Sequence, residues 1–268
     1  MISFPHAKIN LGLSILSKRP DGFHDLETIF YPLPLRDVLE INTGRETRLV
    51  TAGLTLPESS DKNLILKAYG LLKKKYPQIS PLEVHLYKSI PFGAGMGGGS
   101  SDAAAMLRIM TRFFSLPLSS DELFSYALEL GSDCPFFLQD APCLASGRGE
   151  RLEPVSLDLS GYSFLLIHPQ IKINTAWAYS KIKPARPVAP LTEVIHQPIG
   201  SWAATLHNDF ERPVFEEFPF LKTIKEKLYS AGALFASMTG SGSTLYGIFS
   251  KGGLPDLQVD DATYSRIG

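Results

Sequence analysis

Hydrophobic and polar residues alternate along the segment "AKINLGLSIL" near the N-terminus. Ile9, Leu11 and Leu13 fall on one side of the alternation, and Lys8 and Asn10 fall on the other. Because the side chains of a β-strand point alternately to opposite faces, this pattern predicts a half-buried strand. It also predicts that Lys8 and Asn10 lie on the same surface.

Other segments carry apolar residues three and four positions apart, the spacing typical of amphipathic helices. They are "NLILKAYGLLKKKYP", "AAAMLRIMTRFF", "DELFSYALELG" and "FPFLKTIKEKLYSAG". Ser100 or Ser101 is expected to be the N-cap of the second helix. Ser119 and Glu122 have capping-box spacing at the start of the third.

Short apolar runs before and between these helices predict further strands, in "DVLEI", "TRLVTA", "LEVHLYKSI" and "GYSFLLIHP". The segment "ALFASMTGSGSTLYGIF" predicts two strands joined by a Gly-Ser turn. Strands and helices do not follow a sustained β-α-β rhythm, which favours an α+β class over a doubly wound sheet. A change in the sequence pattern near residues 150–160 predicts two domains, 1–155 and 156–268.

The composition excludes several kinds of protein. A net charge of −1 offers no electrostatic footprint for nucleic acid or an anionic membrane. No apolar run reaches the roughly 20 residues of a membrane span, and the start has no signal-peptide pattern, so we expect a cytoplasmic protein. Cys134 and Cys143 lack zinc-ligand spacing and are expected to be small buried residues.

The most informative stretch is "PFGAGMGGGSSDAA", which has five glycines in seven residues between a predicted strand and a predicted helix. A Walker A loop would need a lysine where Ser100 follows Gly99. Gly93, Gly95 and Gly98 match G-x-G-x-x-G, but no acidic residue closes a second strand where a dinucleotide site needs one. Bare backbone N–H groups and a helix N-terminus can bind an anion without a lysine, so the stretch predicts a polyphosphate site.

This stretch resembles the second motif of the GHMP kinases, P-x-x-x-G-[LM]-[GA]-G-G-S-S. In addition, "PHAKINLGL" resembles the first motif of that family and "MTGSGST" the third, in the same order along the chain. The resemblance implies a two-lobed α+β fold with the active site in the cleft between the N- and C-terminal domains. It also implies that ATP and Mg²⁺ are used.

The resemblance implies a nucleotide loop of eleven residues. The hydroxyl of Ser100 or Ser101 is also able to bind Mg²⁺, but the sequence leaves the ligands of the ion open. The ATP-binding residues expected are Pro91, Phe92, Gly93, Ala94, Gly95, Met96, Gly97, Gly98, Gly99, Ser100 and Ser101.

The resemblance also places the family's catalytic lysine and aspartate at Lys8 and Asp133. Asp133 lies in "LGSDCPFFL", past a predicted helix end and against an apolar run, where an unpaired charge is costly. A lysine within about 4–6 Å would hold this carboxylate ionised and polarise an attacking hydroxyl. Phosphoryl transfer requires mainly such positioning and charge compensation.

Three further stretches, "AKINLGLSILSKRPDGFHDLETIF", "GSDCPFFL" and "HPQIKINTAWAY", resemble the family members that act on a cytidine-diphosphate-linked methylerythritol. The implied reaction transfers the γ-phosphoryl group of ATP to the 2-hydroxyl of that small molecule, in the non-mevalonate route to isoprenoids. His24 is then expected to bind the edge of the cytosine, and Phe23 and Tyr179 to offer aromatic faces. Phe23 stands where that motif usually has tyrosine.

The remaining substrate-side expectations concern the diphosphate and polyol ends and the turn of the third motif. The residues expected at the diphosphate and polyol ends are Asn10, His168 and Thr175. The residues expected from the turn of the third motif are Thr239, Gly240, Ser241 and Gly242.

Three alternatives stay open from the sequence. The chain could be another GHMP small-molecule kinase, of the homoserine or mevalonate type, which would not need the "DGFH" stretch or Tyr179. It could be a nucleotide-binding regulator without turnover, although a pure binder has no use for both Lys8 and Asp133. A nicotinamide oxidoreductase is the third.

Overall fold

The computed structural model describes residues 1–55, 63–260 and 262–268. These residues form two compact units, each assembled from segments that are separated along the sequence. The predicted domains, 1–155 and 156–268, stay a prediction. Unit 1 contains Met1–Lys8, Pro32–Phe92 and Gly97–Asp140, and unit 2 contains Ile9–Tyr31, Gly93–Met96 and Ala141–Gly268.

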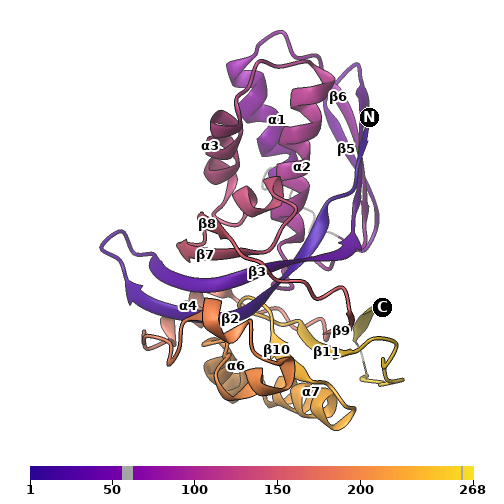
Figure 1. Ribbon diagram of the computed structural model, residues 1–268. Coiled ribbons are helices and arrows are strands. Elements are labelled where there is room, and N and C mark those ends of the chain that lie inside the picture. Colours follow the sequence, from indigo (N-terminus) through magenta and orange to yellow (C-terminus); the bar gives the residue numbers. More distant parts are fainter. Residues whose placement is uncertain (56–62, 261) are drawn as a thin grey trace. The chain divides into compact units, whose positions relative to one another are not determined.

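Unit 1 is built on a four-stranded sheet in the order β1-β4-β6-β5 (Figure 1). The strand β4 (Val38–Thr43) pairs antiparallel with β1 (Ile2–Ser3) and with β6 (Leu82–Lys88), and β5 (Arg48–Gly53) runs parallel to β6. Alternation along β6 buries its apolar side chains and leaves most residues between them at least partly exposed. The strand predicted in "LEVHLYKSI" is confirmed, and one of its faces is buried while the other is partly exposed.

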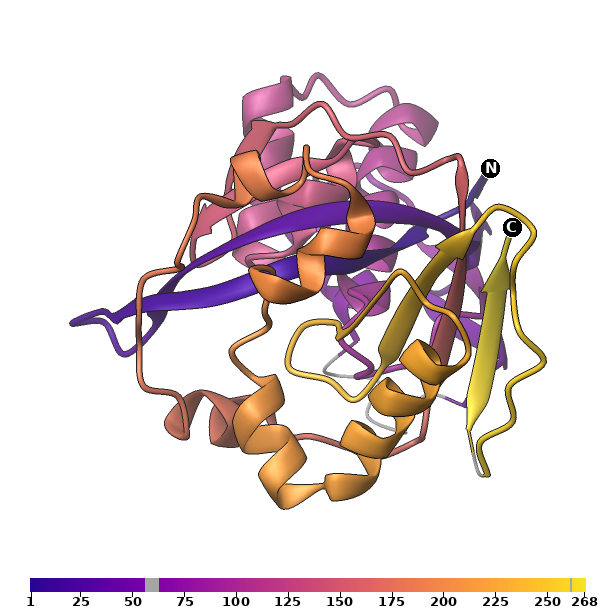
Figure 2. The same cartoon turned by 60° about the horizontal axis from the view of Figure 1, so that its bottom comes forward.

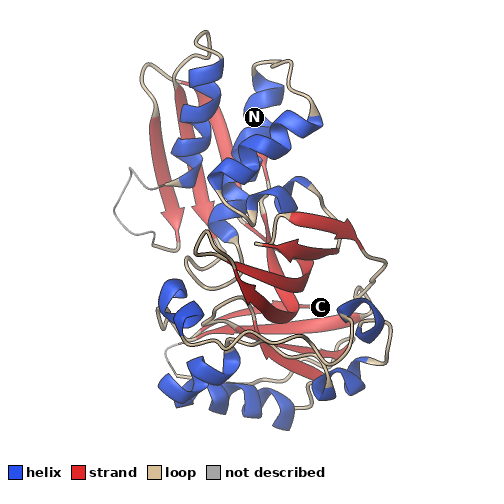
Figure 3. Ribbon diagram, turned by 90° about the vertical axis from the view of Figure 1, so that its left-hand side faces the viewer, coloured by secondary structure: helices blue, strands red, loops and turns tan. Residues whose placement is uncertain are grey.

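Helices cover one side of this sheet (Figure 3). They are α1 (Leu64–Lys75), α2 (Gly98–Phe113) and α3 (Ser120–Leu130), followed by the 3₁₀ helix η2 (Cys134–Leu138). Their buried residues, including those at the predicted helical spacing, pack with the inward side chains of β4 and β6 into one core. This core positions the start of α2 at the end of β6.

Local signals predict the ends of these helices unevenly. The capping box of α3 is confirmed, because Ser119 Oγ accepts from the Glu122 N–H and the Glu122 carboxylate accepts from the Ser119 N–H. The N-cap predicted at Ser100 or Ser101 is wrong. The helix α2 has Gly97 as its N-cap, with φ +69°, and the Ser101 N–H already donates to the Gly97 carbonyl. The left-handed turn at Gly97 starts the helix earlier and leaves both serines in its first turn.

Unit 2 contains most of a second sheet, in the order β2-β3-β7-β8. The strands are β2 (His6–Lys18), β3 (His24–Arg36), β7 (Cys143–Gly147) and β8 (Arg151–Pro154). The expectation that β2 is half-buried is wrong, because its residues 6–15 are buried on both faces. Lys8 is 3% exposed and Asn10 is 2% exposed, since polar partners inside the protein surround them.

A third sheet in unit 2 has the order β10-β11-β9-β12 and is antiparallel throughout. It contains β9 (Tyr162–His168), β10 (Phe235–Met238), β11 (Leu245–Ser250) and β12 (Thr263–Ile267). The predicted Gly-Ser hairpin is confirmed, since it joins β10 to β11.

The helices of unit 2 are mostly short. The longest, α7 (Pro219–Ser230), packs on β10 and β11 (Figure 2). The mixed antiparallel sheets and helices confirm the α+β class. Among the described helices, none has both the length and the apolar composition needed to cross a membrane. The others are α4 (Thr175–Ser180), α5 (Leu191–Val194), η3 (Ile199–Ala204) and α6 (Glu211–Glu217).

Candidate active site

The glycine loop connects β6 to α2 and has an unusual backbone. Gly93, Gly95 and Gly97 have φ values of +66°, +79° and +69°, the left-handed region that favours glycine. A Cβ added at Gly93 or at Gly99 would meet no atom within 4 Å. The loop therefore has bare main chain that faces open space at two points, as a backbone cradle for an anion requires.

The start of α2, in unit 1, is by itself suited to an anion. Its N-cap makes no side-chain capping hydrogen bond, so no capping side chain occupies the N–H groups of the first turn. The positive end of the helix dipole also lies there, which favours a bound phosphate group. Residues Gly97–Ser101 belong to unit 1, and residues Gly93–Met96 belong to unit 2.

In unit 1 the loop lies against the candidate catalytic residues. A Cβ at Gly97 would lie 2.6 Å from the ring of Phe137, in η2, and 3.4 Å from Cε of Lys8. Only glycine allows this close approach. The start of α2 is therefore held next to Lys8 and to the segment that follows Asp133.

Lys8 and Asp133 lie together as expected, with Nζ and Oδ2 3.7 Å apart. The Lys8 side chain is 3% exposed and that of Asp133 is 39% exposed. Burial lowers the pKa of Lys8, and the nearby Asp133 charge raises it in part. Asp133 precedes η2 but its carboxylate makes no capping hydrogen bond there. The pair thus presents an accessible carboxylate beside a buried cation.

The cysteines behave as expected. Both are buried, and neither is part of a disulfide bond. Burial raises the pKa of Cys134 to about 12, and burial also raises the pKa of Cys143. Both thiols are therefore protonated near neutral pH, and neither is a candidate nucleophile.

One hydroxyl suited to Mg²⁺, that of Ser100, lies near the segment of Asp133. Ser100 lies within hydrogen-bonding reach of Cys134, the residue after Asp133, and Ser100 is more exposed than the buried Ser101. Across the described residues, no group of three or more His, Cys, Asp or Glu could hold a metal alone. A hydroxyl and a carboxylate beside a phosphate cradle fit Mg²⁺ that is held mainly by phosphate oxygens and water.

In unit 2 the glycine loop touches the turn between β10 and β11. Thr239 Oγ lies 3.1 Å from the Gly95 carbonyl and 3.1 Å from Asn10 Oδ1, and its hydroxyl can donate to either. The Gly240 N–H donates to the same Asn10 oxygen at 2.9 Å. A Cβ at Gly240 would lie 3.1 Å from Cα of Gly95. The third motif is thus packed directly on the loop of the second.

Asn10 connects this turn to the strands. Its amide nitrogen donates to Thr28 Oγ at 3.0 Å, and Tyr246 OH donates to its backbone carbonyl at 2.8 Å. These contacts give Asn10 a structural task, and its predicted contact with the substrate stays a prediction. The sequence analysis missed Thr28 and Tyr246, since no local pattern links residues 18 and 236 positions apart.

Asn208 is another residue that the sequence analysis missed. Its side-chain nitrogen donates to the carbonyls of Met238 and Gly240, at 2.7 and 2.9 Å, and so fixes the turn of the third motif. The only sequence signal is an Asn-Asp pair just before α6, which suggests a local cap. Asn208 does accept from the Phe210 N–H in that way, but its nitrogen serves a distant strand.

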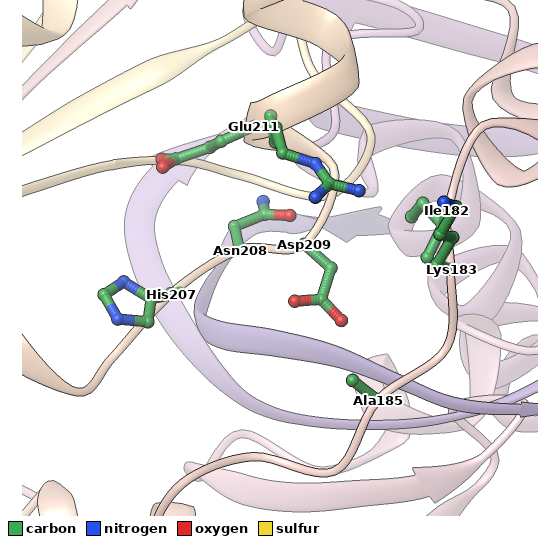
Figure 4. A pocket seen from close by; sticks show the side chains of 8 residues that line it. Ile182, Lys183, Ala185, His207, Asn208, Asp209 and Glu211 are labelled. Atoms are coloured by element: carbon green, nitrogen blue, oxygen red, sulfur yellow. The ribbon is translucent and has the colours of Figure 1, made fainter.

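The segment around Asn208 also lines a cavity of about 360 Å³ within unit 2 (Figure 4). Asp209 projects into this region in the close-up, and its Oδ2 accepts from the Ile15 N–H at 2.7 Å. Burial raises the pKa of Asp209. Lys183 and Ala185 form the opposite side, and the Ala185 N–H donates to the Ile15 carbonyl. The cavity thus lies along an edge of β2.

The aromatic residues predicted for the base are partly assembled. The rings of His24 and Tyr179 stack, with centroids 4.9 Å apart and an interplanar angle of 24°. Tyr179 also contacts Phe210 edge to face. Phe23 is 52% exposed, and the Arg148 guanidinium lies 4.5 Å over its ring. Arg148, in a "GRGE" turn, is a neighbour that the sequence analysis did not anticipate.

Thr175 and His168, two of the three residues expected at the diphosphate and polyol ends, lie next to the Gly-Ser turn and β11. Thr175 Oγ is 3.1 Å from Ser241 Oγ, and His168 Nδ1 is 3.2 Å from Thr244 Oγ. Burial lowers the pKa of His168, which favours the neutral ring. The structure therefore brings Thr175 to the predicted residue Ser241, although the roles of both stay predictions.

Comparisons with known proteins agree with this arrangement. Residues 63–141 match the model of the GHMP kinases N terminal domain, and residues 192–259 match that of the GHMP kinases C terminal domain. A 4-diphosphocytidyl-2-C-methyl-D-erythritol kinase of Parabacteroides distasonis is 49% identical over 251 residues, covering 94% of this chain and 92% of the relative. One from Cytophaga hutchinsonii is 49% identical over 251 residues, covering 93% of each.

Solved structures give the same picture. A crystal structure of 4-(cytidine 5'-diphospho)-2C-methyl-D-erythritol kinase is similar with a TM-score of 0.79 and 32% identity, covering 92% of this chain and 90% of that one. A mevalonate kinase structure shares only the fold, with a TM-score of 0.64 at 14% identity, covering 99% of this chain and 98% of that one. The fold expected from the sequence motifs is confirmed.

Proposed function

The chain belongs to the 4-diphosphocytidyl-2-C-methyl-D-erythritol kinases within the GHMP kinase family, and we propose that it phosphorylates the 2-hydroxyl of this cytidine-linked polyol. It is an ATP-dependent phosphotransferase of an alcohol group. The observation that carries the residue assignment is the Lys8–Asp133 pair, 3.7 Å apart and packed against Gly97 of the glycine loop.

ATP is proposed to bind with its phosphates on the glycine loop. The open space beside Gly93 and Gly99 supports this placement, as does the uncapped start of α2. The Ser100 hydroxyl and the Asp133 carboxylate would help to hold Mg²⁺. When bound, the ion would neutralise charge on the phosphate oxygens.

Asp133 and Lys8 are proposed to carry the transfer itself. The Asp133 carboxylate accepts the proton of the substrate hydroxyl while the hydroxyl oxygen bonds to the γ-phosphorus. The bond between this phosphorus and its bridging oxygen breaks, and ADP leaves with the electron pair. The Lys8 ammonium, buried and held beside Asp133, keeps the carboxylate oriented and offsets the negative charge of the transferred group.

Unit 2 is proposed to select the acceptor through its cytidine end. The stacked His24 and Tyr179 rings support a base site, because aromatic faces and a ring N–H suit a pyrimidine. Thr175 and Ser241 supply two neighbouring hydroxyls for the diphosphate or polyol part of the acceptor. Phe23, paired with Arg148, is assigned to the outer part of the same base site.

An acceptor panel tests this function directly. Purified protein with Mg·ATP would be offered 4-diphosphocytidyl-2-C-methyl-D-erythritol, homoserine and mevalonate in separate ADP-release assays. Release with the cytidine compound alone is expected, and Asp133→Asn should abolish most of it. Release only with another acceptor would refute the assigned substrate. Nucleotide binding without release for any acceptor would refute turnover.

A further inference from the structure

Three buried charged side chains in unit 1 form a cluster at the glycine loop, here called the Lys88 cluster. Lys88 Nζ lies 2.5 Å from Asp37 Oδ2 and 2.7 Å from Asp102 Oδ2. The exposed fractions of Asp37, Lys88 and Asp102 are 0%, 1% and 3%. Within the family motifs Lys88 precedes the glycine segment and Asp102 follows it, and the proposed chemistry uses none of the three.

The cluster joins the two ends of the loop. Asp37 Oδ1 accepts from the N–H groups of Ser89 and Ile90, at 2.6 and 2.8 Å, just before the loop starts. Asp102 lies near the start of α2, one residue after the loop ends at Ser101. Lys88 bonds to both carboxylates, so one ammonium group sets the distance between the strand that enters the loop and the helix that leaves it.

We propose that Asp37, Lys88 and Asp102 are positioning residues that hold the two ends of the glycine loop at the separation required for binding ATP phosphates. This inference rests on the proposed function, because it assigns the loop to ATP. The three side chains do not touch the nucleotide in this account. They act on it through the backbone that they hold.

The energetics favour a positioning role over a purely stabilising one. Apolar residues of similar volume usually stabilise a core as well as or better than a buried ion network. The cluster has two carboxylates for one ammonium, and Asp102 Oδ1 is buried without a hydrogen-bond partner among the described residues. This arrangement is poor for stability, but it determines a backbone geometry closely.

Asp102→Ala tests the proposal, because it cuts the tie to α2 and leaves the neutral Lys88–Asp37 pair in place. Asp102→Asn is its conservative partner, since the amide oxygen can still accept from Lys88. Glu83→Ala is the matched control: it removes an ion pair with Arg48, at 2.6 Å, from the opposite end of the same strand. Binding of Mg·ADP and of a non-hydrolysable ATP analogue would be measured by calorimetry, without acceptor, beside the melting temperature.

We expect Asp102→Ala to weaken nucleotide binding about tenfold or more while the protein stays folded, and Asp102→Asn to restore most of the affinity. Glu83→Ala should leave affinity unchanged. Unchanged affinity in folded Asp102→Ala would overturn the proposal, as would equal losses in Asp102→Asn or in the control. Because no acceptor is present, these outcomes are independent of turnover. A wild-type protein that binds nucleotide but phosphorylates nothing would refute the proposed function and leave the cluster testable.

Discussion

Gly95 offers the sharpest test of how the glycine loop is packed. Its φ is +79°, and a Cβ at this position would lie 2.1 Å from the Thr239 carbonyl oxygen and 2.9 Å from the Thr239 carbonyl carbon. Both atoms are main chain, so no flexible side chain can move aside. Gly93, two residues earlier, has a φ of +66° and a Cβ there would meet nothing within 4 Å. Alanine at Gly93 is therefore the matched control for alanine at Gly95.

The two substitutions share one cost in stability, and Gly95→Ala has two further costs. Each places a Cβ in the left-handed region, which costs about 1 kcal/mol of stability. Gly95→Ala also forces the loop away from the turn, roughly 1–3 kcal/mol for overpacking, and weakens the contact between Thr239 Oγ and the Gly95 carbonyl, about 1 kcal/mol. The expected totals are about 1 kcal/mol for Gly93→Ala and roughly 3–5 kcal/mol for Gly95→Ala.

Thermal unfolding followed by circular dichroism or calorimetry measures this difference. For a chain of this size, 1 kcal/mol lowers the melting temperature by roughly 2–4 °C, so Gly95→Ala should melt roughly 6–20 °C below the wild type. Gly93→Ala should fall by only a few degrees. Equal shifts for the two variants would refute the reasoning, because they would mean that the main chains of Gly95 and Thr239 are not in contact.

Three further predictions concern catalysis, substrate selection and pH. Asp133→Asn should lower kcat by roughly 10²–10⁴-fold with little change in melting temperature, and Lys8→Met should act in the same direction; near wild-type turnover in either would contradict the assigned pair. His24→Ala should raise KM for the cytidine substrate roughly 5- to 150-fold while KM for ATP changes little. Steady-state kinetics with each substrate varied measures both constants, and an unchanged KM for the cytidine substrate would contradict the assignment of His24. Burial raises the pKa of Asp102 from 3.8 to about 7, so the folded state binds the carboxyl proton more tightly than the unfolded state does. The stability that this proton contributes is complete below about pH 4 and is lost as the pH rises through 7. The free energy of unfolding from urea titrations should therefore fall more between about pH 4 and pH 8 in the wild type than in Asp102→Asn, and identical pH profiles would exclude this carboxyl as the cause.

Local features of this chain were predictable because they depend on neighbours in sequence. The capping box of Ser119 and Glu122 needs only the spacing of one helical turn, and it is present as expected. The Gly-Ser hairpin and the bare backbone of the glycine loop likewise follow from residue type. The N-cap of α2 is Gly97 and not a serine, because the chain takes a left-handed turn there. Glycine permits such a turn but does not require it, so residue type alone does not predict it.

The burial of β2 shows where such reasoning fails. Alternation in "AKINLGLSIL" reports which side chains are polar, but it does not report what covers them. Buried Lys8 has Asp133 3.7 Å away as its ionic partner, and buried Asn10 has a hydrogen-bond partner in a turn 229 positions later. A polar face can be buried when partners satisfy it, so the expectation of a half-buried strand was wrong.

The sequence by itself determined the longer helices and several strands, the α+β class, the family motifs and the glycine-rich segment, since each depends on residue type and short spacing. Only the tertiary structure decided which polar groups meet. Asn208 reaches the carbonyls of Met238 and Gly240, and Lys88 lies between Asp37 and Asp102. These partners are distant along the chain, and their contacts exist because packing of the core brings buried backbone and charged groups together, where each must find a partner away from water.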